Sequence, residues 1–104
     1  MRNFPSAFLL WLLGYKNVQL VPVAFASGAT TGSQAITDVV VNKCDVEYLG
    51  QSTSVGSGGT PTLANYGRLT GFTTNLISIT RDSGVNSGGG AVTGTMVFRI
   101  KERR

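Results

Sequence analysis

The sequence contains no histidine and a single cysteine, Cys44. Histidine is the commonest general base and metal ligand in proteins, so its absence excludes a Ser-His-Asp triad. One cysteine cannot form an intrachain disulfide, and without histidine it cannot complete a structural zinc site within one chain. The lack of a disulfide favours an intracellular origin, or a particle assembled inside a cell. We therefore expect no catalytic residue, no metal site and no cofactor, and a protein that is not an enzyme.

Charge is also scarce, because only 13% of the residues are charged. That is about half the usual share for a soluble domain. Either water wets a surface of glycine, serine and threonine, or partner molecules cover much of it. The apolar N-terminus described below favours the second interpretation.

Glycine and strand-forming residues make up much of what is present. Fourteen glycines in 104 residues favour turns over long helices, since glycine destabilises helices. Runs of valine, isoleucine, threonine, tyrosine and phenylalanine favour strands. The length fits one domain. We expect a mainly β fold: a small antiparallel sheet or sandwich with an apolar N-terminal arm and long Gly/Ser-rich loops.

Four segments have the composition of strands, and they span residues 19–25, 37–49, 71–81 and 92–102. Pro22 restricts the first to a sheet edge or a bulge. Period-two alternation in the second places Cys44 on the apolar face, as a small buried side chain rather than a nucleophile. In the fourth, alternation places Val92, Met96, Phe98 and Ile100 on one face, with a gap at Gly94. We expect the last two segments to pair as an antiparallel hairpin through residues 82–91.

Residues 1–26 have three interpretations. A signal peptide would use Arg2, an apolar core and an Ala-Phe-Ala cleavage site at residues 24–26, although Lys16 and Pro22 lengthen the gap between core and site. A membrane-spanning helix needs roughly 20 apolar residues, which this run does not reach. We favour an apolar arm or short helix that docks on a neighbouring subunit or on the protein's own sheet, followed by a β domain at residues 27–104. The expected interface residues of the arm are Phe8, Leu9, Leu10, Trp11, Leu12 and Leu13.

Few side chains form a pattern typical of ligand binding. Asp45 and Glu47 share one strand face, where they would bind a cation or simply face solvent beside Lys43. Residues 88–90 are three glycines whose backbone N–H groups could meet phosphate, but no Walker-type pattern follows them. A flexible hairpin tip explains these glycines better.

The positive charge of the chain lies in its C-terminal part. From residue 67 onward there are six basic and two acidic residues, whereas the two signs balance before it. Arg99, Lys101 and Arg103 recur with period two on one face of the last strand, and Arg104 follows. These four residues would contact phosphate or an acidic partner. The alternative is an edge strand that its charges protect from aggregation.

These features suggest three functions. We expect a non-enzymatic structural component of a virus or phage particle, such as a minor capsid, decoration or tail protein, acting through subunit contacts. It would reside in the virion, with other protein subunits as partners and nucleic acid as a contact of the basic C-terminus. The alternatives are a secreted or cell-surface, pilus-like β subunit with a cleaved signal peptide, and a small basic nucleic-acid-binding module.

Overall fold

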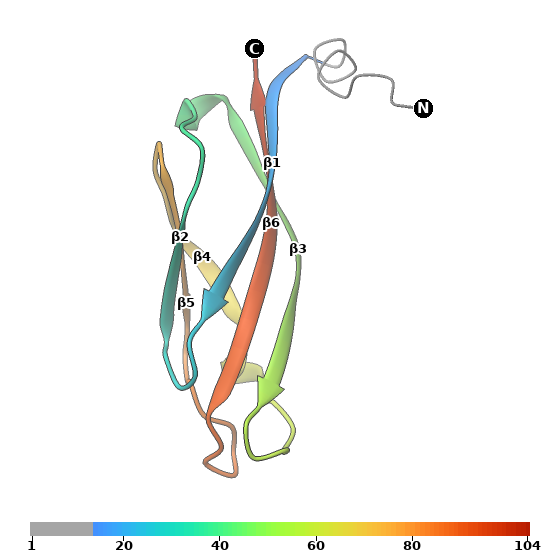
Figure 1. The fold of residues 1–104 in the computed structure, drawn as a ribbon, viewed down its shortest axis with the longest axis vertical. Helices are drawn as coiled ribbons and strands as arrows, with labels where there is room; N and C mark the ends of the chain where they lie inside the picture. The colour runs from blue at the N-terminus through green and yellow to red at the C-terminus, as the bar shows by residue number, and fades with distance from the viewer. Residues whose placement is uncertain (1–13) are drawn as a thin grey trace, which may run out of the picture.

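The computed structural model describes residues 14–104, and nearly all of its regular secondary structure is β-strand (Figure 1). The six interface residues expected in the arm, Phe8 to Leu13, lie outside the described residues. The strands are β1 (Tyr15–Phe25), β2 (Thr31–Ala35), β3 (Cys44–Val55), β4 (Gly67–Phe72), β5 (Leu76–Arg81) and β6 (Val92–Arg103). Two short 3-10 turns, η1 (Val41–Lys43) and η2 (Leu63–Asn65), precede β3 and β4. The expectation of a mainly β fold is confirmed.

The strands form two antiparallel three-stranded sheets that pack as a sandwich. Sheet A has the order β1-β6-β3 and sheet B the order β2-β5-β4. Figure 1 shows the two sheets as separate layers with their strands running along the long axis. β6 is therefore the central strand of one sheet and β5 the central strand of the other.

The expected hairpin between residues 71–81 and 92–102 is wrong. The first segment is divided by a turn after Phe72, where the backbone N–H of Thr73 donates to the carbonyl of Leu76 at 2.8 Å. Its two halves, β4 and β5, pair with each other, and β6 pairs with β1 and β3. Both β5 and β6 carry a row of apolar residues on one face. Placing the two strands in opposite sheets allows these rows to be buried against each other.

The core lies between the sheets and draws on three strands. Its buried cluster comprises Val21, Val23 and Phe25 of β1, Ile77 and Ile79 of β5, and Met96, Phe98 and Ile100 of β6. The face predicted for the last strand is thus the buried one. Residues 15–25 share this core with the rest of the chain, so the expected division after residue 26 separates no structural unit among residues 14–104. Pro22 lies on an edge strand, as its missing N–H requires.

The gap expected at Gly94 is filled by the side chain of Gln51 from β3. A Cβ atom on Gly94 would lie 2.9 Å from Nε2 of Gln51. The same amide donates to the carbonyl of Asn65 at 3.0 Å and accepts from the N–H of Gly67 at 2.8 Å. The Gln51 amide thus bonds a backbone carbonyl and a backbone N–H, as a neighbouring strand would, and links β3 of sheet A to the start of β4 in sheet B.

The strand expected at residues 37–49 begins later than predicted and extends further, as β3. Residues 36–43 instead cross from sheet B to sheet A, with Val39 buried. Gln19 of β1 holds this crossing through two hydrogen bonds to Thr37, and Glu102 accepts the N–H of Val40 at 2.8 Å. Hydrogen bonds to side chains of sheet A therefore hold this segment, together with backbone hydrogen bonds from Ile36 and Val39 to the turn between β4 and β5.

Candidate interaction surface

The outer face of sheet A, the side turned away from sheet B, has an apolar middle. Alternation along β1 points Val21, Val23 and Phe25 inward, so Leu20 and Pro22 point outward. Leu20 is 67% exposed. Val97 of β6 faces outward beside Pro22, and Leu49, at the bulge of β3, is 45% exposed. We call Leu20, Pro22, Leu49 and Val97 the apolar band.

One end of this face carries paired charges. Glu47 of β3 lies opposite Arg99 of β6, and its two carboxylate oxygens accept from Nε and Nη2 of Arg99, both at 3.0 Å. Nζ of Lys101 lies 3.7 Å from the same carboxylate. Nη1 of Arg103 donates to Asp45 at 2.8 Å. These pairs are partly exposed, so solvent screens them and each contributes little to stability.

The bidentate pair shifts both of its members toward their charged forms. The hydrogen bonds from Arg99 lower the pKa of Glu47, and the nearby charges of Arg99 and Lys101 lower it further. The hydrogen bonds from Glu47 raise the pKa of Arg99. Asp45 and Glu47 do share a face, as predicted, but both carboxylates are engaged by arginine side chains of β6.

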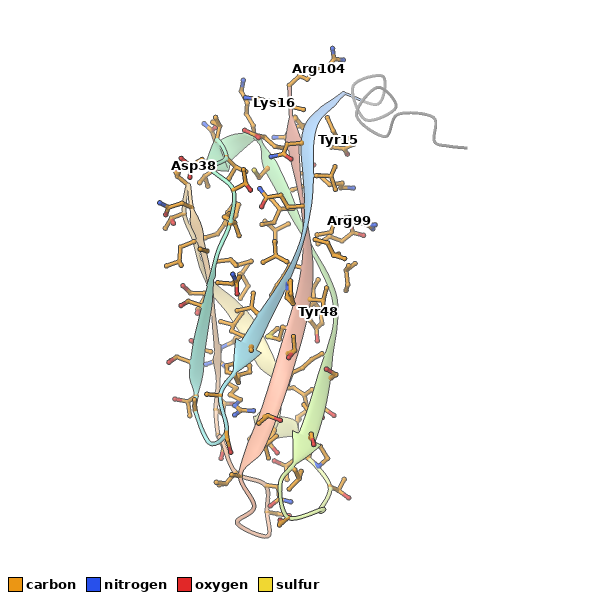
Figure 2. The ribbon with its side chains drawn as sticks, in the orientation of Figure 1. Tyr15, Lys16, Asp38, Tyr48, Arg99 and Arg104 are labelled. Atoms are coloured by element: carbon orange, nitrogen blue, oxygen red, sulfur yellow. The ribbon has the colours of Figure 1, made fainter. Side chains whose placement is uncertain are left out.

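The predicted basic row exists, but its setting differs from both interpretations. Arg99, Lys101 and Arg103 share the outer face, and Figure 2 shows Arg99 directed away from the sandwich. The expected edge strand is wrong, because β6 lies between β1 and β3. The backbone N–H of Arg104 donates to the carbonyl of Gly14 at 3.1 Å. Phosphate contact by these four residues stays a prediction, and three of them would first have to exchange a carboxylate partner for it.

The other end of the face is rich in hydroxyl groups. Thr93 and Thr95 of β6 lie opposite Ser54 and Ser52 of β3, and the hydroxyl of Thr93 donates to the carbonyl of Ser54 at 3.4 Å. Along the strands, the outer face of sheet A therefore changes from paired charges through the apolar band to neutral hydroxyls. No other strand of residues 14–104 packs on this face.

Sequence reasoning missed Arg81, a charged side chain inside the sandwich. Arg81 is 1% exposed, and its Nε and Nη2 donate to the carbonyls of Ala29 and Val92 at 2.7 and 2.6 Å. Its guanidinium carbon lies 4.4 Å from the centre of the Phe25 ring. Burial lowers its pKa, and Nη1 has no hydrogen-bond partner. Period two continued from Ile77 and Ile79 would have placed residue 81 on the buried face.

Two buried asparagines fix the loops at the same end of the sandwich. Asn65 is fully buried and donates to the carbonyls of Ser83 and Val85 at 3.0 and 2.8 Å. Asn86 accepts from the N–H groups of Gly88 and Gly90 through its side chain, and its carbonyl accepts from Gly89 at 3.0 Å. The three glycines therefore direct their N–H groups to Asn86 rather than toward a phosphate.

Cys44 has the setting of a packing residue. It lies against the core cluster, and its thiol donates to the carbonyl of Val40 at 3.5 Å. Burial raises the pKa of the Cys44 thiol, and the charge of Glu102 raises it further. A raised pKa keeps the thiol protonated, which is unfavourable for a nucleophile.

The outer face of sheet B holds a shallow hollow of about 350 Å³, which is neutral and lined largely by hydroxyl groups. Its lining residues are Thr31, Gly32, Ser33, Thr70, Ser78, Ile79 and Thr80. None of these side chains titrates near neutral pH, so the hollow offers no acid or base. Within residues 14–104, no group of three or more acidic or cysteine side chains is arranged to hold a metal ion.

No helix in the described part of the chain is long and apolar enough to cross a membrane. Comparison with protein-family models, with curated proteins and with solved structures finds no match for this chain.

Proposed function

We propose that this protein is a non-enzymatic structural subunit of a larger assembly, and that it acts through the outer face of sheet A. The observation that carries the proposal is the apolar band in the middle of a sheet face that no other strand of residues 14–104 covers. In a sandwich that stands alone in water, outward strand positions are normally polar. Here four successive outward positions of β1, namely Val18, Leu20, Pro22 and Ala24, are all apolar.

The paired charges beside the band support the same proposal. Burying an unpaired charge is costly, whereas a charge that already has a hydrogen-bonded partner can enter an interface at lower cost. Glu47 and Arg99 meet this condition before any partner arrives. The charged end of this face can therefore be buried against another protein at a lower desolvation cost than unpaired charges would require.

The proposed assembly is a virus particle, with the chain as a minor capsid, decoration or tail protein. The support is the low share of charged residues, the apolar residues 8–13 and the apolar band. A particle subunit covers such surfaces with its neighbours.

The exported alternative receives less support, because cleavage after residue 26 would remove β1 and its three core residues. The nucleic-acid alternative would rely on cations that are already paired with carboxylates.

The test is incorporation of variants in cells that make the assembly. Leu20→Asp places a charge in the apolar band and should lower recovery of the chain in the particle fraction at least tenfold. Leu63→Asp is the matched control, because Leu63 is 89% exposed and lies in η2, outside sheet A. Recovery of the unaltered chain only as a free monomer would refute the proposal.

A further inference from the structure

We infer that the outer face of sheet A binds the same face of a second copy of this chain around a two-fold axis. This inference rests on the proposed function and names the partner at that face. The reasons are the order of the three surface zones along the strands, the state of the charges and the area of the face.

The order of the zones makes the face complementary to itself in one orientation. Six outward residues mark rungs along β6, at Thr93, Thr95, Val97, Arg99, Lys101 and Arg103, and the apolar band lies near their middle. A two-fold axis that crosses the strands between Val97 and Arg99 turns the second copy end for end. Leu20 then meets Pro22 of the other copy, and Val97 meets Arg99, whose guanidinium is already paired with Glu47. The Lys101–Arg103 end of each copy meets the hydroxyl end of the other.

The same rotation keeps β1 over β1. The apolar outward row of one β1 strand would then pack on that of its partner, with Leu20 over Pro22. An axis parallel to the strands would instead place β1 over β3, and apolar residues would meet Asp45 and Glu47. It would also place the two basic rows against each other, which like charges oppose.

The charges of this face suit a two-fold contact with neutral hydroxyls. Arg99 and Arg103 each have a carboxylate partner within their own copy, so no charge needs a partner from the other copy. Lys101 and Arg103 retain N–H groups that can donate to hydroxyl oxygens of Thr93 and Thr95. Such an interface leaves no buried charge unpaired.

The area of the face indicates how tightly the two copies should bind. β1 and β6 have 11 and 12 residues. At about 3.3 Å per residue, and with strands about 4.8 Å apart, the face covers roughly 550 Å² per copy. About 1,100 Å² for the pair lies at the lower end of specific interfaces. We therefore expect a reversible dimer with a dissociation constant on the order of micromolar.

The experiment uses the full chain in two measurements. Sedimentation equilibrium over a concentration series should give a monomer–dimer equilibrium. Leu20→Asp should weaken it at least tenfold, while Leu63→Asp should leave it unchanged. Circular dichroism of each variant establishes that the sandwich is retained.

Pulsed electron paramagnetic resonance then tests the orientation, with a spin label on Thr93→Cys in a Cys44→Ala background. The end-for-end dimer places the two labels roughly 35 Å apart, whereas the parallel arrangement places them roughly 10–15 Å apart. Sedimentation of the labelled chain checks that it still dimerises.

Three outcomes would overturn the inference: a monomer at all concentrations, a dimer unaffected by Leu20→Asp, or the short label distance. A monomer would mean that residues 1–13 or a different subunit covers the face. If Leu20→Asp still lowered incorporation into particles in that case, the proposed function would stand without the two-fold dimer.

Discussion

Arg81 is a charged side chain buried between the sheets, so its guanidinium needs protein groups in place of water. A buried guanidinium is tolerated here because the carbonyl of Ala29 in the β1–β2 connection, the carbonyl of Val92 in β6 and the face of Phe25 replace water around it. These contacts join the β1–β2 connection to the start of β6. Arg81 therefore holds the β1–β2 connection against the first residue of β6 through hydrogen bonds of its side chain.

Replacing Arg81 by Met should lower the free energy of unfolding by about 2 kcal/mol, because the carbonyls of Ala29 and Val92 would lose the hydrogen bonds that the guanidinium donates to them. Urea denaturation measures the effect. Arg68→Met is the matched control, since the Arg68–Asp82 ion pair is more than half exposed and should contribute less than about 1 kcal/mol. Equal stability of the two variants would show that the Arg81 hydrogen bonds are unimportant for folding.

The Glu47–Arg99 ion pair joins neighbouring strands of sheet A, β3 and β6. The pKa of Glu47 is lowered from its ordinary value of 4.5 by the Arg99 hydrogen bonds. A carboxylate with a lower pKa in the folded state contributes stability above its unfolded pKa and loses it as the pH falls.

Stability should therefore decrease as the pH falls from 4.5 through the lowered pKa of Glu47, and Glu47→Gln should make this decrease less steep. Thermal unfolding between pH 6 and the acid limit of folding measures the difference. The same steepness in both proteins would contradict a coupling between this pair and folding.

At the scale of the whole molecule, β1 is indispensable to the sandwich. It supplies three members of the core cluster and one edge of sheet A. It also lies so close to β2 that a Cβ on Gly32 would collide with the backbone of Ala24. A chain without β1 would expose one side of the core to water.

We expect a chain that begins at Ser27 to lack cooperative thermal unfolding, because it has lost β1. A chain that begins at Gly14 is the control and should unfold cooperatively, since it retains every described strand. Circular dichroism on heating compares the two. Cooperative unfolding of the shorter chain would restore the exported subunit with a cleaved leader as the better explanation.

Local patterns in the sequence determined the fold class, the faces of the strands and the edge position of β1. The reason is that alternation acts over a few residues, and the missing N–H of Pro22 acts at one position. The buried face of β6 and the packing role of Cys44 followed from the same alternation.

Only the tertiary structure decided which strands pair, which carboxylate meets each arginine, and how Arg81 is satisfied. These contacts join residues far apart in the sequence: Glu47 and Arg99 are 52 positions apart, as are Ala29 and Arg81. Whether β5 pairs with β6 or packs against it depends on which arrangement buries both apolar rows at once. Strand pairing therefore depends on the packing of the whole core, and the sequence of a single segment does not determine it.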